Sequence, residues 1–183
     1  MIKRLTGFVL FPALVAIVLF LGLSCTGTNP ASAPFLSTVS FVNPPGDIGI
    51  PPNTQVLIDV SAIVLNPDGL PLNDVKVTWK LTFANQNDLV YDTDGDGIAD
   101  SRALQFVDPD ECQEVGLDCS LVSSEFYVPF GALKDSPIQK LTNNQGVTRI
   151  LILAFGDFPV DPASLEVSIG TDSDVVEFSV TNP

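Results

Sequence analysis

Hydrophobic and polar residues alternate along several segments of this chain. In residues 74–83 every second residue is apolar (Val75, Val77, Trp79, Leu81 and Phe83), and the residues between them are polar or charged. This period of two predicts a strand with one buried and one exposed face, because successive side chains of a strand point to opposite sides. Alternating or continuous apolar patterns predict further strands at residues 37–42, 55–65, 121–130, 147–155, 165–169 and 176–181.

Turn-forming residues separate these predicted strands. Asn66-Pro67-Asp68-Gly69 follows one apolar run, and Asn143-Asn144-Gln145-Gly146 precedes another. Gly, Pro, Asn and Asp favour such turns. About seven short strands, no helical periodicity after the first 24 residues and no internal repeat predict an all-β, antiparallel β-sandwich.

The first 24 residues follow a different pattern. Lys3 and Arg4 precede residues 5–23, which carry no charge, and Cys25 comes soon after. A short basic start, an apolar run and small residues before a cleavage site define a secretory signal. An uncleaved membrane helix is one alternative, although such a helix needs about 20 apolar residues and this run contains Pro12. Plain secretion is the other.

The sequence Leu21-Gly22-Leu23-Ser24-Cys25 resembles the lipobox of bacterial lipoproteins. The resemblance implies that the Cys25 thiol receives a diacylglycerol, that residues 1–24 are removed as a signal peptide, and that the new amine is acylated. Gly22 departs from the usual pattern, which has a branched apolar residue at that place. Two or three lipid chains would hold a small domain stably at a membrane.

The lipobox divides the rest of the chain. Residues 25–36 are small, polar and rich in Pro, and we expect them to be a lipidated tether. Residues 37–183 then form one folded domain. Thr26 follows the Cys, where an Asp would favour retention in the inner membrane of enteric bacteria. We therefore expect a cell-envelope protein anchored in the outer membrane.

The charge of the chain narrows its partners. The formal net charge is −14, and two of the eight basic residues, Lys3 and Arg4, lie in the removed segment, so the mature chain is still more acidic. Nucleic-acid binding needs basic patches, and anionic lipid headgroups repel an acidic surface. Cation binding fits such a charge. The partners that we expect are a membrane, through the lipid anchor, and a protein or glycan.

The residue types for catalysis are mostly missing. The chain has no His, the commonest general base and transition-metal ligand. It has no Ser/His/Asp set, phosphate loop or metal-hydrolase motif. A glycosidase needs only two carboxylates, but a sandwich of this size leaves little room for a deep cleft. We predict that the protein is not an enzyme.

Two further cysteines lie close together in the sequence. If Cys25 is lipidated, Cys112 and Cys119 remain as an even pair. In an oxidising compartment such a pair suggests a disulfide, and two reduced thiols are the alternative. A zinc site is not favoured, because two thiolates without His supply only half of the usual ligands.

A long acidic insertion, about residues 84–120, carries the clearest candidate chemistry. Loops of that length are uncommon in compact domains and are often functional. Within it, residues 92–100 read Asp-Thr-Asp-Gly-Asp-Gly-Ile-Ala-Asp. Oxygen-bearing side chains at positions 1, 3, 5 and 9 with Gly at position 6 follow the calcium-loop scheme, in which alternate carboxylates converge on one hard cation. A solvated acidic turn is the alternative.

This string resembles thrombospondin type-3 and dockerin-like calcium repeats. The resemblance implies Ca²⁺ ligands at Asp92, Asp94, Asp96 and Asp100. By the calcium-loop scheme we also expect Ile98 to contribute its backbone carbonyl and to place its side chain in the core. Ala103 stands where an EF-hand has Glu, which argues against a helix–loop–helix EF-hand. Later acids, Asp108, Asp110 or Glu111, are candidates to complete the shell. An affinity of about 10⁻⁴–10⁻³ M is typical of extracellular calcium modules.

Residues 37–183 resemble bacterial immunoglobulin-like domains of the invasin and intimin type. The resemblance rests on the stretch Asn66-Pro67-Asp68-Gly69-Leu70-Pro71-Leu72-Asn73-Asp74-Val75-Lys76-Val77-Thr78-Trp79 and on Leu141-Thr142-Asn143-Asn144-Gln145-Gly146-Val147-Thr148. It implies an immunoglobulin-like sandwich with Trp79 in the core between the sheets. The expected function is a calcium-stabilised binding or structural module in adhesion or envelope organisation. The alternative is a carbohydrate-binding or accessory subunit of a larger surface assembly.

Overall fold

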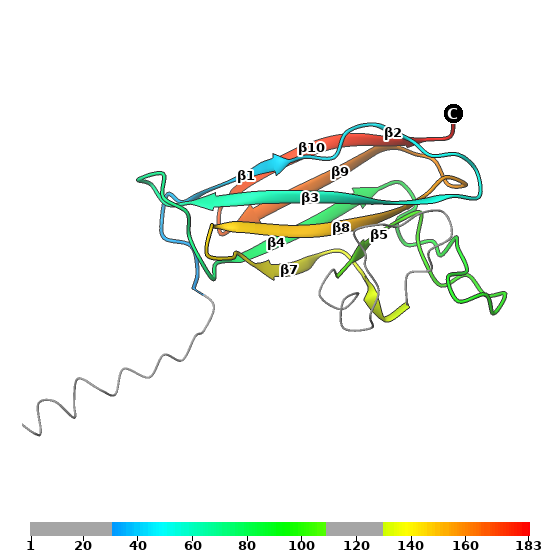
Figure 1. Cartoon of the computed structure of the whole chain (residues 1–183), viewed down its shortest axis with the longest axis horizontal. Helices are drawn as coiled ribbons and strands as arrows, with labels where there is room; N and C mark the ends of the chain where they lie inside the picture. Colours follow the sequence, from blue (N-terminus) through cyan, green and yellow to red (C-terminus); the bar gives the residue numbers. More distant parts are fainter. Residues whose placement is uncertain (1–30, 109–129) are drawn as a thin grey trace, which may run out of the picture.

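The computed structural model describes residues 31–108 and 130–183. Within these ranges the chain forms two five-stranded sheets that pack face to face (Figure 1). The elements are β1 (Thr38–Asn43), β2 (Ile48–Gly49), β3 (Gln55–Leu65), β4 (Lys76–Phe83), β5 (Leu104–Val107), the 3-10 helix η1 (Phe130–Ala132), β6 (Leu133–Lys134), β7 (Ile138–Leu141), β8 (Val147–Phe155), β9 (Val160–Ile169) and β10 (Asp172–Thr181).

The strand order is that of an immunoglobulin-like sandwich. One sheet has the order β1-β3-β8-β5-β6 and the other has the order β2-β10-β9-β4-β7. Strands β1, β3, β8 and β5 thus take the places of A, B, E and D in the immunoglobulin fold, and β10, β9 and β4 take those of G, F and C. The short strand β2 pairs in parallel with β10. The predicted all-β sandwich of about seven strands is confirmed, with the three short strands β2, β6 and β7 in addition.

The core lies between the sheets and is centred on Trp79. The Trp79 side chain is fully buried, and its ring is tilted against Phe41 with 6.0 Å between the centroids. Its indole Nε1 donates a hydrogen bond to Thr148 Oγ1 on the opposite sheet at 3.4 Å. The polar atom of this large side chain therefore has a partner inside the apolar core. The expected place of Trp79 between the sheets is confirmed.

One open side of the sandwich is closed by carboxylates. Strand β1 pairs with β3 along one edge, which leaves alternate N–H groups pointing outward. The N–H of Val39 donates to Asp172 Oδ2 at 2.7 Å, and the N–H of Phe41 donates to Asp174 Oδ2 at 3.0 Å. The side chains of β10 therefore bind the first strand of the other sheet where no backbone ladder joins the two.

Several predicted strands have different bounds in the structure. The segments Gln55–Leu65 and Val147–Phe155 match, but β9 begins at Val160 and β10 begins at Asp172, earlier than predicted. The larger correction concerns the insertion at residues 84–120, which is not loop throughout, because β5 lies within it and all four of its residues are buried. Four residues are too few for a strand period to stand out in the sequence.

Other predictions fall outside the described residues. These are the signal peptide, Cys25, the pair Cys112 and Cys119, the acids Asp110 and Glu111, and residues 121–129 of one predicted strand. Phe130, the last residue of that predicted strand, begins the helix η1 instead. In the ranges 31–108 and 130–183, no helix has the length and hydropathy to cross a membrane.

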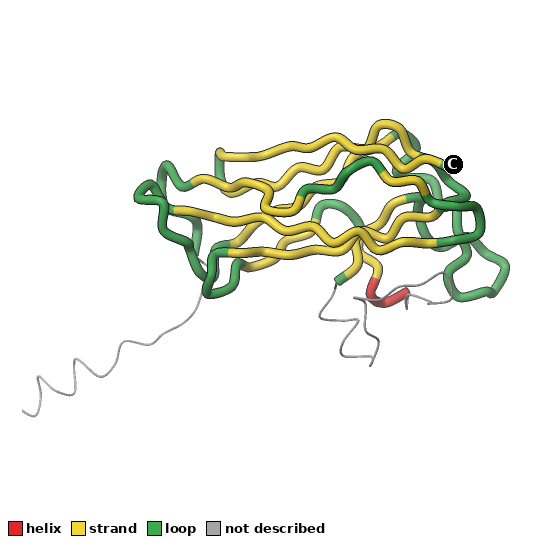
Figure 2. Tube along the Cα trace, turned by 45° about the horizontal axis from the view of Figure 1, so that its top comes forward, coloured by secondary structure: helices red, strands yellow, loops and turns green. Residues whose placement is uncertain are grey.

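The two ends of the sandwich differ. The strands run along its length and the connections gather at its ends (Figure 2). At one end the chain enters through Ala31, whose N–H donates to Asp74 O at 3.2 Å and which forms a bridge with Val75. We call this the entry end. The acidic loop lies at the opposite end, which is also the end at which the chain terminates (Figure 1). Ala31 and Ala33, which belong to the tether expected at residues 25–36, already contact the folded domain.

Candidate cation site in the acidic loop

The acidic loop, residues 92–100, is closed at its base by a short antiparallel bridge. Tyr91 N donates to Ser101 O at 3.1 Å, and Ser101 N donates to Tyr91 O at 2.9 Å. Asp100 N also donates to Tyr91 O at 2.8 Å. The loop therefore leaves and rejoins the domain at one point, in the manner of a hairpin whose tip is the nine-residue acidic string.

Aromatic stacking fixes this base to the sandwich. The Tyr91 ring stacks on Phe155 with 4.0 Å between the centroids and 22° between the planes. Phe158 meets the edge of the same ring at 6.3 Å. Phe155 is the last residue of β8 and is almost fully buried. The acidic loop is therefore attached to a central strand of the sheet.

The carboxylate of Asp92 organises the inside of the loop. It accepts hydrogen bonds from Gly95 N and Gly97 N, each at 2.7 Å. Both glycines have positive φ, 78° and 87°, a conformation that other residues adopt at a cost. The bond from Gly97 is the main cause that lowers the pKa of Asp92 below its ordinary value. Asp92 is therefore ionised at neutral pH.

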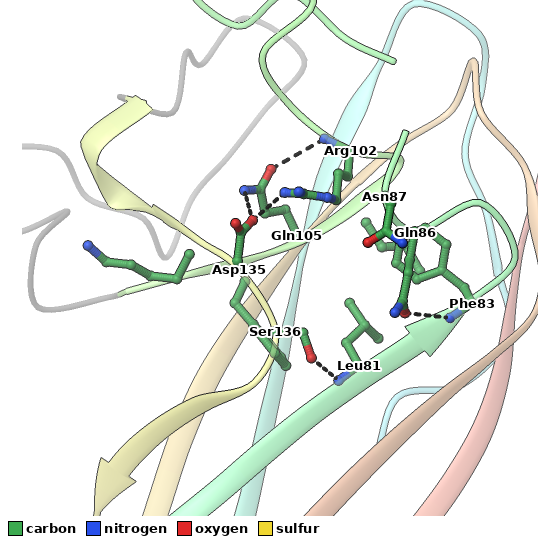
Figure 3. Close-up of a pocket in the computed structure, with 11 residues that line it drawn as sticks. Leu81, Phe83, Gln86, Asn87, Arg102, Gln105, Asp135 and Ser136 are labelled. Carbon is green, nitrogen blue, oxygen red and sulfur yellow. Dashed lines mark hydrogen bonds and ion pairs between the residues drawn. The ribbon is translucent and has the colours of Figure 1, made fainter. Parts of the chain in front are cut away.

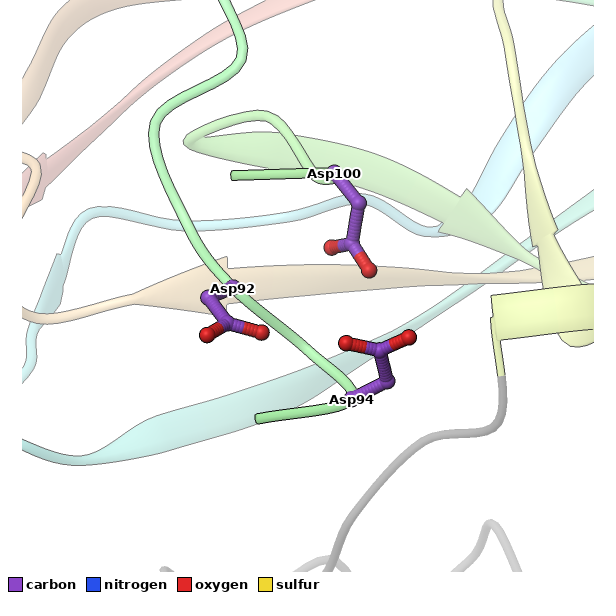
Figure 4. A group of neighbouring side chains, drawn as sticks. All are labelled: Asp92, Asp94 and Asp100. Atoms are coloured by element: carbon purple, nitrogen blue, oxygen red, sulfur yellow. The ribbon is translucent and has the colours of Figure 1, made fainter. Parts of the chain in front are cut away.

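Three carboxylates converge in the acidic loop. Asp92, Asp94 and Asp100 each offer an oxygen, and these oxygens lie within 4.8 Å of one another (Figure 4). Ca²⁺ binds oxygens at about 2.3–2.6 Å, so oxygens on opposite sides of one ion are about 5 Å apart. The spacing therefore fits a common cation. A calcium shell has six to eight oxygens, and backbone carbonyls and water would supply the rest.

The remaining predicted ligands behave differently. Asp96 is not in the converging group, and its Oδ1 accepts a hydrogen bond from Ile98 N at 2.8 Å. The expectation that the Ile98 side chain lies in the core is wrong, because it is 68 % exposed. The bridge at Tyr91 and Ser101 closes the loop before its tip can fold back on the sandwich, so Ile98 stays in solvent. Asp108 binds Lys140 Nζ at 2.8 Å as part of an ion pair.

A small pocket lies against β5 and was not predicted from the sequence. It has a volume of about 140 Å³, and its lining residues include Phe83 and Leu104 as well as Gln86, Asn87 and Arg102 (Figure 3). Its polar residues come from three separate stretches of the sequence, residues 86–87, 102–105 and 134–136, which is why no local motif marked it.

Several polar residues of this pocket form hydrogen bonds or ion pairs with other residues that line it. Arg102 forms an ion pair with Asp135, and Gln105 Nε2 also donates to Asp135 at 3.4 Å. Gln86 Oε1 accepts a hydrogen bond from Phe83 N at 3.4 Å, and Ser136 Oγ accepts one from Leu81 N at 2.8 Å.

Comparisons with known proteins give little more. No protein-family model and no curated protein is similar to this chain. Among solved structures, PapD-like domain 7 of human CEP192 is similar with a TM-score of 0.37 and 13% identity, covering 84% of this chain and 91% of that chain. A conjugative transposon lipoprotein from Bacteroides eggerthii is similar with a TM-score of 0.35 and 14% identity, and the match covers 80% of this chain and 98% of that chain. Such TM-scores describe a loose overlap and carry no statement about what this chain does.

Proposed function

We propose that this protein is a lipid-anchored cell-envelope module whose immunoglobulin-like domain holds a calcium-stabilised acidic loop away from the membrane. The observation that carries the proposal is the placement of the acidic loop. Its three converging carboxylates lie at one end of the sandwich, and Ala31, through which the chain leads back to Cys25, lies at the other. A strand of 11 residues such as β3 spans about 35 Å.

The role of such a module is binding or structure rather than catalysis. An exposed loop at the free end of an anchored domain is accessible to proteins or glycans outside the membrane. Bound Ca²⁺ would hold the carboxylates in one arrangement and offset their mutual repulsion. We propose adhesion or envelope organisation as the role, an invasin- or intimin-type family, and an outer-membrane location suggested by Thr26. A Cys112–Cys119 disulfide would be a second constraint within the same insertion.

Calcium is expected to stabilise the protein through the acidic loop. At ten to a hundred times its Kd, Ca²⁺ should raise the free energy of unfolding by about 1.4–2.7 kcal/mol. We expect the Asp94→Asn variant to lose most of this gain, because Asn keeps the side-chain oxygen that accepts from Asp96 N (3.1 Å) but removes the charge. Thermal unfolding with Ca²⁺ and with a chelator measures both effects.

The Asp88→Asn variant is the matched control for the calcium experiment. It removes the same charge four residues before Asp92, outside the acidic loop. It should keep the full response to Ca²⁺. An equal gain in the wild type and in Asp94→Asn would contradict the proposed site, and no gain in the wild type would contradict a calcium role.

The anchor has its own test. We expect mass spectrometry of the membrane fraction to find an N-terminal peptide that begins at Cys25 and carries a diacylglycerol and an acyl chain. The Cys25→Ser variant should lose this modification and the cleavage that follows it. Cys112→Ser is the control thiol variant and should keep both. A wild-type chain that retains residues 1–24 in the membrane would contradict the lipoprotein proposal.

The pocket favours a second candidate function, binding of a small polar ligand such as a sugar unit. Side-chain amides (Gln86 and Asn87) and a guanidinium group (Arg102) hydrogen-bond well to hydroxyl groups, and Phe83 supplies an apolar surface. Glycan-array binding that is lost in Asn87→Ala and keeps its strength with a chelator would favour this carbohydrate-binding role. A pull-down from the native envelope that captures a stoichiometric protein in a calcium-dependent way would favour the first.

A further inference from the structure

Large apolar side chains are exposed at the entry end. Eight large hydrophobic residues are exposed in the described part of the chain, and four of them lie at this end: Phe35, Leu36, Leu70 and Leu141. Phe35 is 86 % exposed and Leu36 is 67 % exposed, although they are neighbours in one loop. Two adjacent large side chains that stay in water call for an explanation, because single exposed residues are common but clusters mark contact surfaces.

The backbone holds this pair outward. Ser37 N donates to Pro34 O at 3.1 Å, which closes a turn over Phe35 and Leu36. Leu36 has a φ of 66°, in the left-handed region that a bulky residue rarely adopts. The loop stands apart from the turn between β9 and β10, and the groove between them has a volume of about 430 Å³. The turn therefore directs the side chains of Phe35 and Leu36 outward from the entry end.

The position of the anchor identifies what lies there. Ala31 is fixed to Val75 at this end, and Cys25 is only six residues earlier. Six residues reach at most about 20 Å. A lipid on Cys25 would therefore keep the entry end, which includes Phe35 and Leu36, within about 20 Å of the bilayer.

We infer that the entry end rests on the bilayer, with Phe35 and Leu36 inserted among the lipids. This inference depends on the proposed function for the membrane attachment alone, not for calcium. Apolar insertion rather than charge would drive the contact, because Asp68 and Asp74 are exposed at the same end and repel anionic headgroups. The expected partner surface is a zwitterionic bilayer. Such a contact orients the sandwich upright and directs the acidic loop outward.

Fluorescence quenching tests this contact on the full chain, purified from membranes and reconstituted into phosphatidylcholine vesicles with brominated acyl chains. In the Phe35→Trp variant the added indole should be quenched by bromine and shifted to the blue. Leu89→Trp is the control, because Leu89 is 49 % exposed but lies in the region of the acidic loop. It should be quenched several-fold less. Trp79, which is fully buried, gives a constant background.

A second substitution checks that Leu36 contributes. Asn tolerates positive φ, so Leu36→Asn in the Phe35→Trp background removes the apolar side chain and keeps the turn. Loss of one buried Leu should lower the insertion equilibrium about tenfold. A blue shift without bromine quenching would mean that a second copy or another protein covers the pair, and it would overturn the inference. Solvent-like fluorescence of the Phe35→Trp variant would overturn it as well.

The mass of the N-terminal peptide, measured on the same sample, separates the two proposals. A lipidated Cys25 without quenching refutes only the membrane contact. Quenching in a chain that retains residues 1–24 and carries no lipid on Cys25 supports the contact and refutes lipidation, because an uncleaved apolar segment would hold the same end of the domain at the membrane through Ala31. A chain that does not associate with membranes at all refutes both.

Discussion

Replacing Gly156 with Ala is expected to destabilise the domain by about 3 kcal/mol or more. A Cβ atom on Gly156 would lie 2.0 Å from the carbonyl oxygen of Pro51 and 2.8 Å from that of Ile50. Both neighbours are backbone atoms, so they cannot rotate away as a side chain can. Overpacking usually costs about 1–3 kcal/mol, and a contact of this length with backbone belongs at or above the upper limit. Urea unfolding followed by Trp79 fluorescence measures the loss.

Other glycines separate the causes. Gly46 has no atom within 4 Å of its Cβ position and no positive φ, so Gly46→Ala should change stability little. Gly69 has a φ of 78° with open space around it, so Gly69→Ala should cost about 1–2 kcal/mol from backbone strain alone. Gly146 has a φ of 73°, and a Cβ added there would lie 2.8 Å from Val64 O. The Gly146→Ala variant should therefore lose more stability than Gly69→Ala.

The relative stability losses of these Gly→Ala variants test whether the turn at Gly156 is packed against residues 50–51. A loss for Gly156→Ala no larger than that for Gly46→Ala would mean that residues 50–51 do not pack against this turn. The position also bears on the acidic loop, because Gly156 follows Phe155, on which Tyr91 stacks. A shift of the turn should therefore weaken the calcium response as well as global stability. Gly69→Ala, at the opposite end, should leave the calcium response unchanged.

The sequence predicted the long strands well because their burial follows a simple period. In β4 the residues Val77, Trp79 and Leu81 alternate with exposed or half-buried ones, as the pattern required. The sequence did not predict β10 from its first residue, and the reason is physical. Asp172 and Asp174 hold the same phase as the buried Phe178 but bind N–H groups of β1 instead of joining the apolar core. A polar residue in an inward position hides the period from a hydrophobic pattern.

The candidate site was predicted in part. The oxygens of Asp92, Asp94 and Asp100 do lie close together, as the spacing of acids in residues 92–100 indicated, because local hydrogen bonds to Gly95 and Gly97 determine this loop, and their binding of Ca²⁺ stays a prediction. The outward position of Ile98 depends instead on where the loop is attached. That attachment is the stacking of Tyr91 on Phe155, a contact between residues 64 positions apart, and no local motif encodes it.

Removing the carboxylates that bind β1 is expected to be the second most damaging change. In the Asp172→Ala/Asp174→Ala variant the N–H groups of Val39 and Phe41 lose their acceptors, which are 2.7 and 3.0 Å away. Hydrogen bonds to charged groups contribute about 1.5–3 kcal/mol each, so the pair should cost about 3 kcal/mol or more. The Asp172→Asn/Asp174→Asn variant keeps an acceptor oxygen at each place and should lose less. Glu177→Ala, an exposed acid on the same strand, should be nearly neutral.

Removal of the Asp172 and Asp174 carboxylates should also make the protein self-associate. Without Asp172 and Asp174 the outer edge of β1 presents unpaired N–H groups, which can pair with a strand of another molecule. We expect the alanine variant to self-associate in size-exclusion chromatography at concentrations at which the wild type does not, and the asparagine variant to resemble the wild type. β1 is also the first strand after Phe35 and Leu36, so its detachment would release these two residues from the sandwich. An alanine variant as stable as Glu177→Ala and unchanged in its association would show that the β3 ladder alone holds β1.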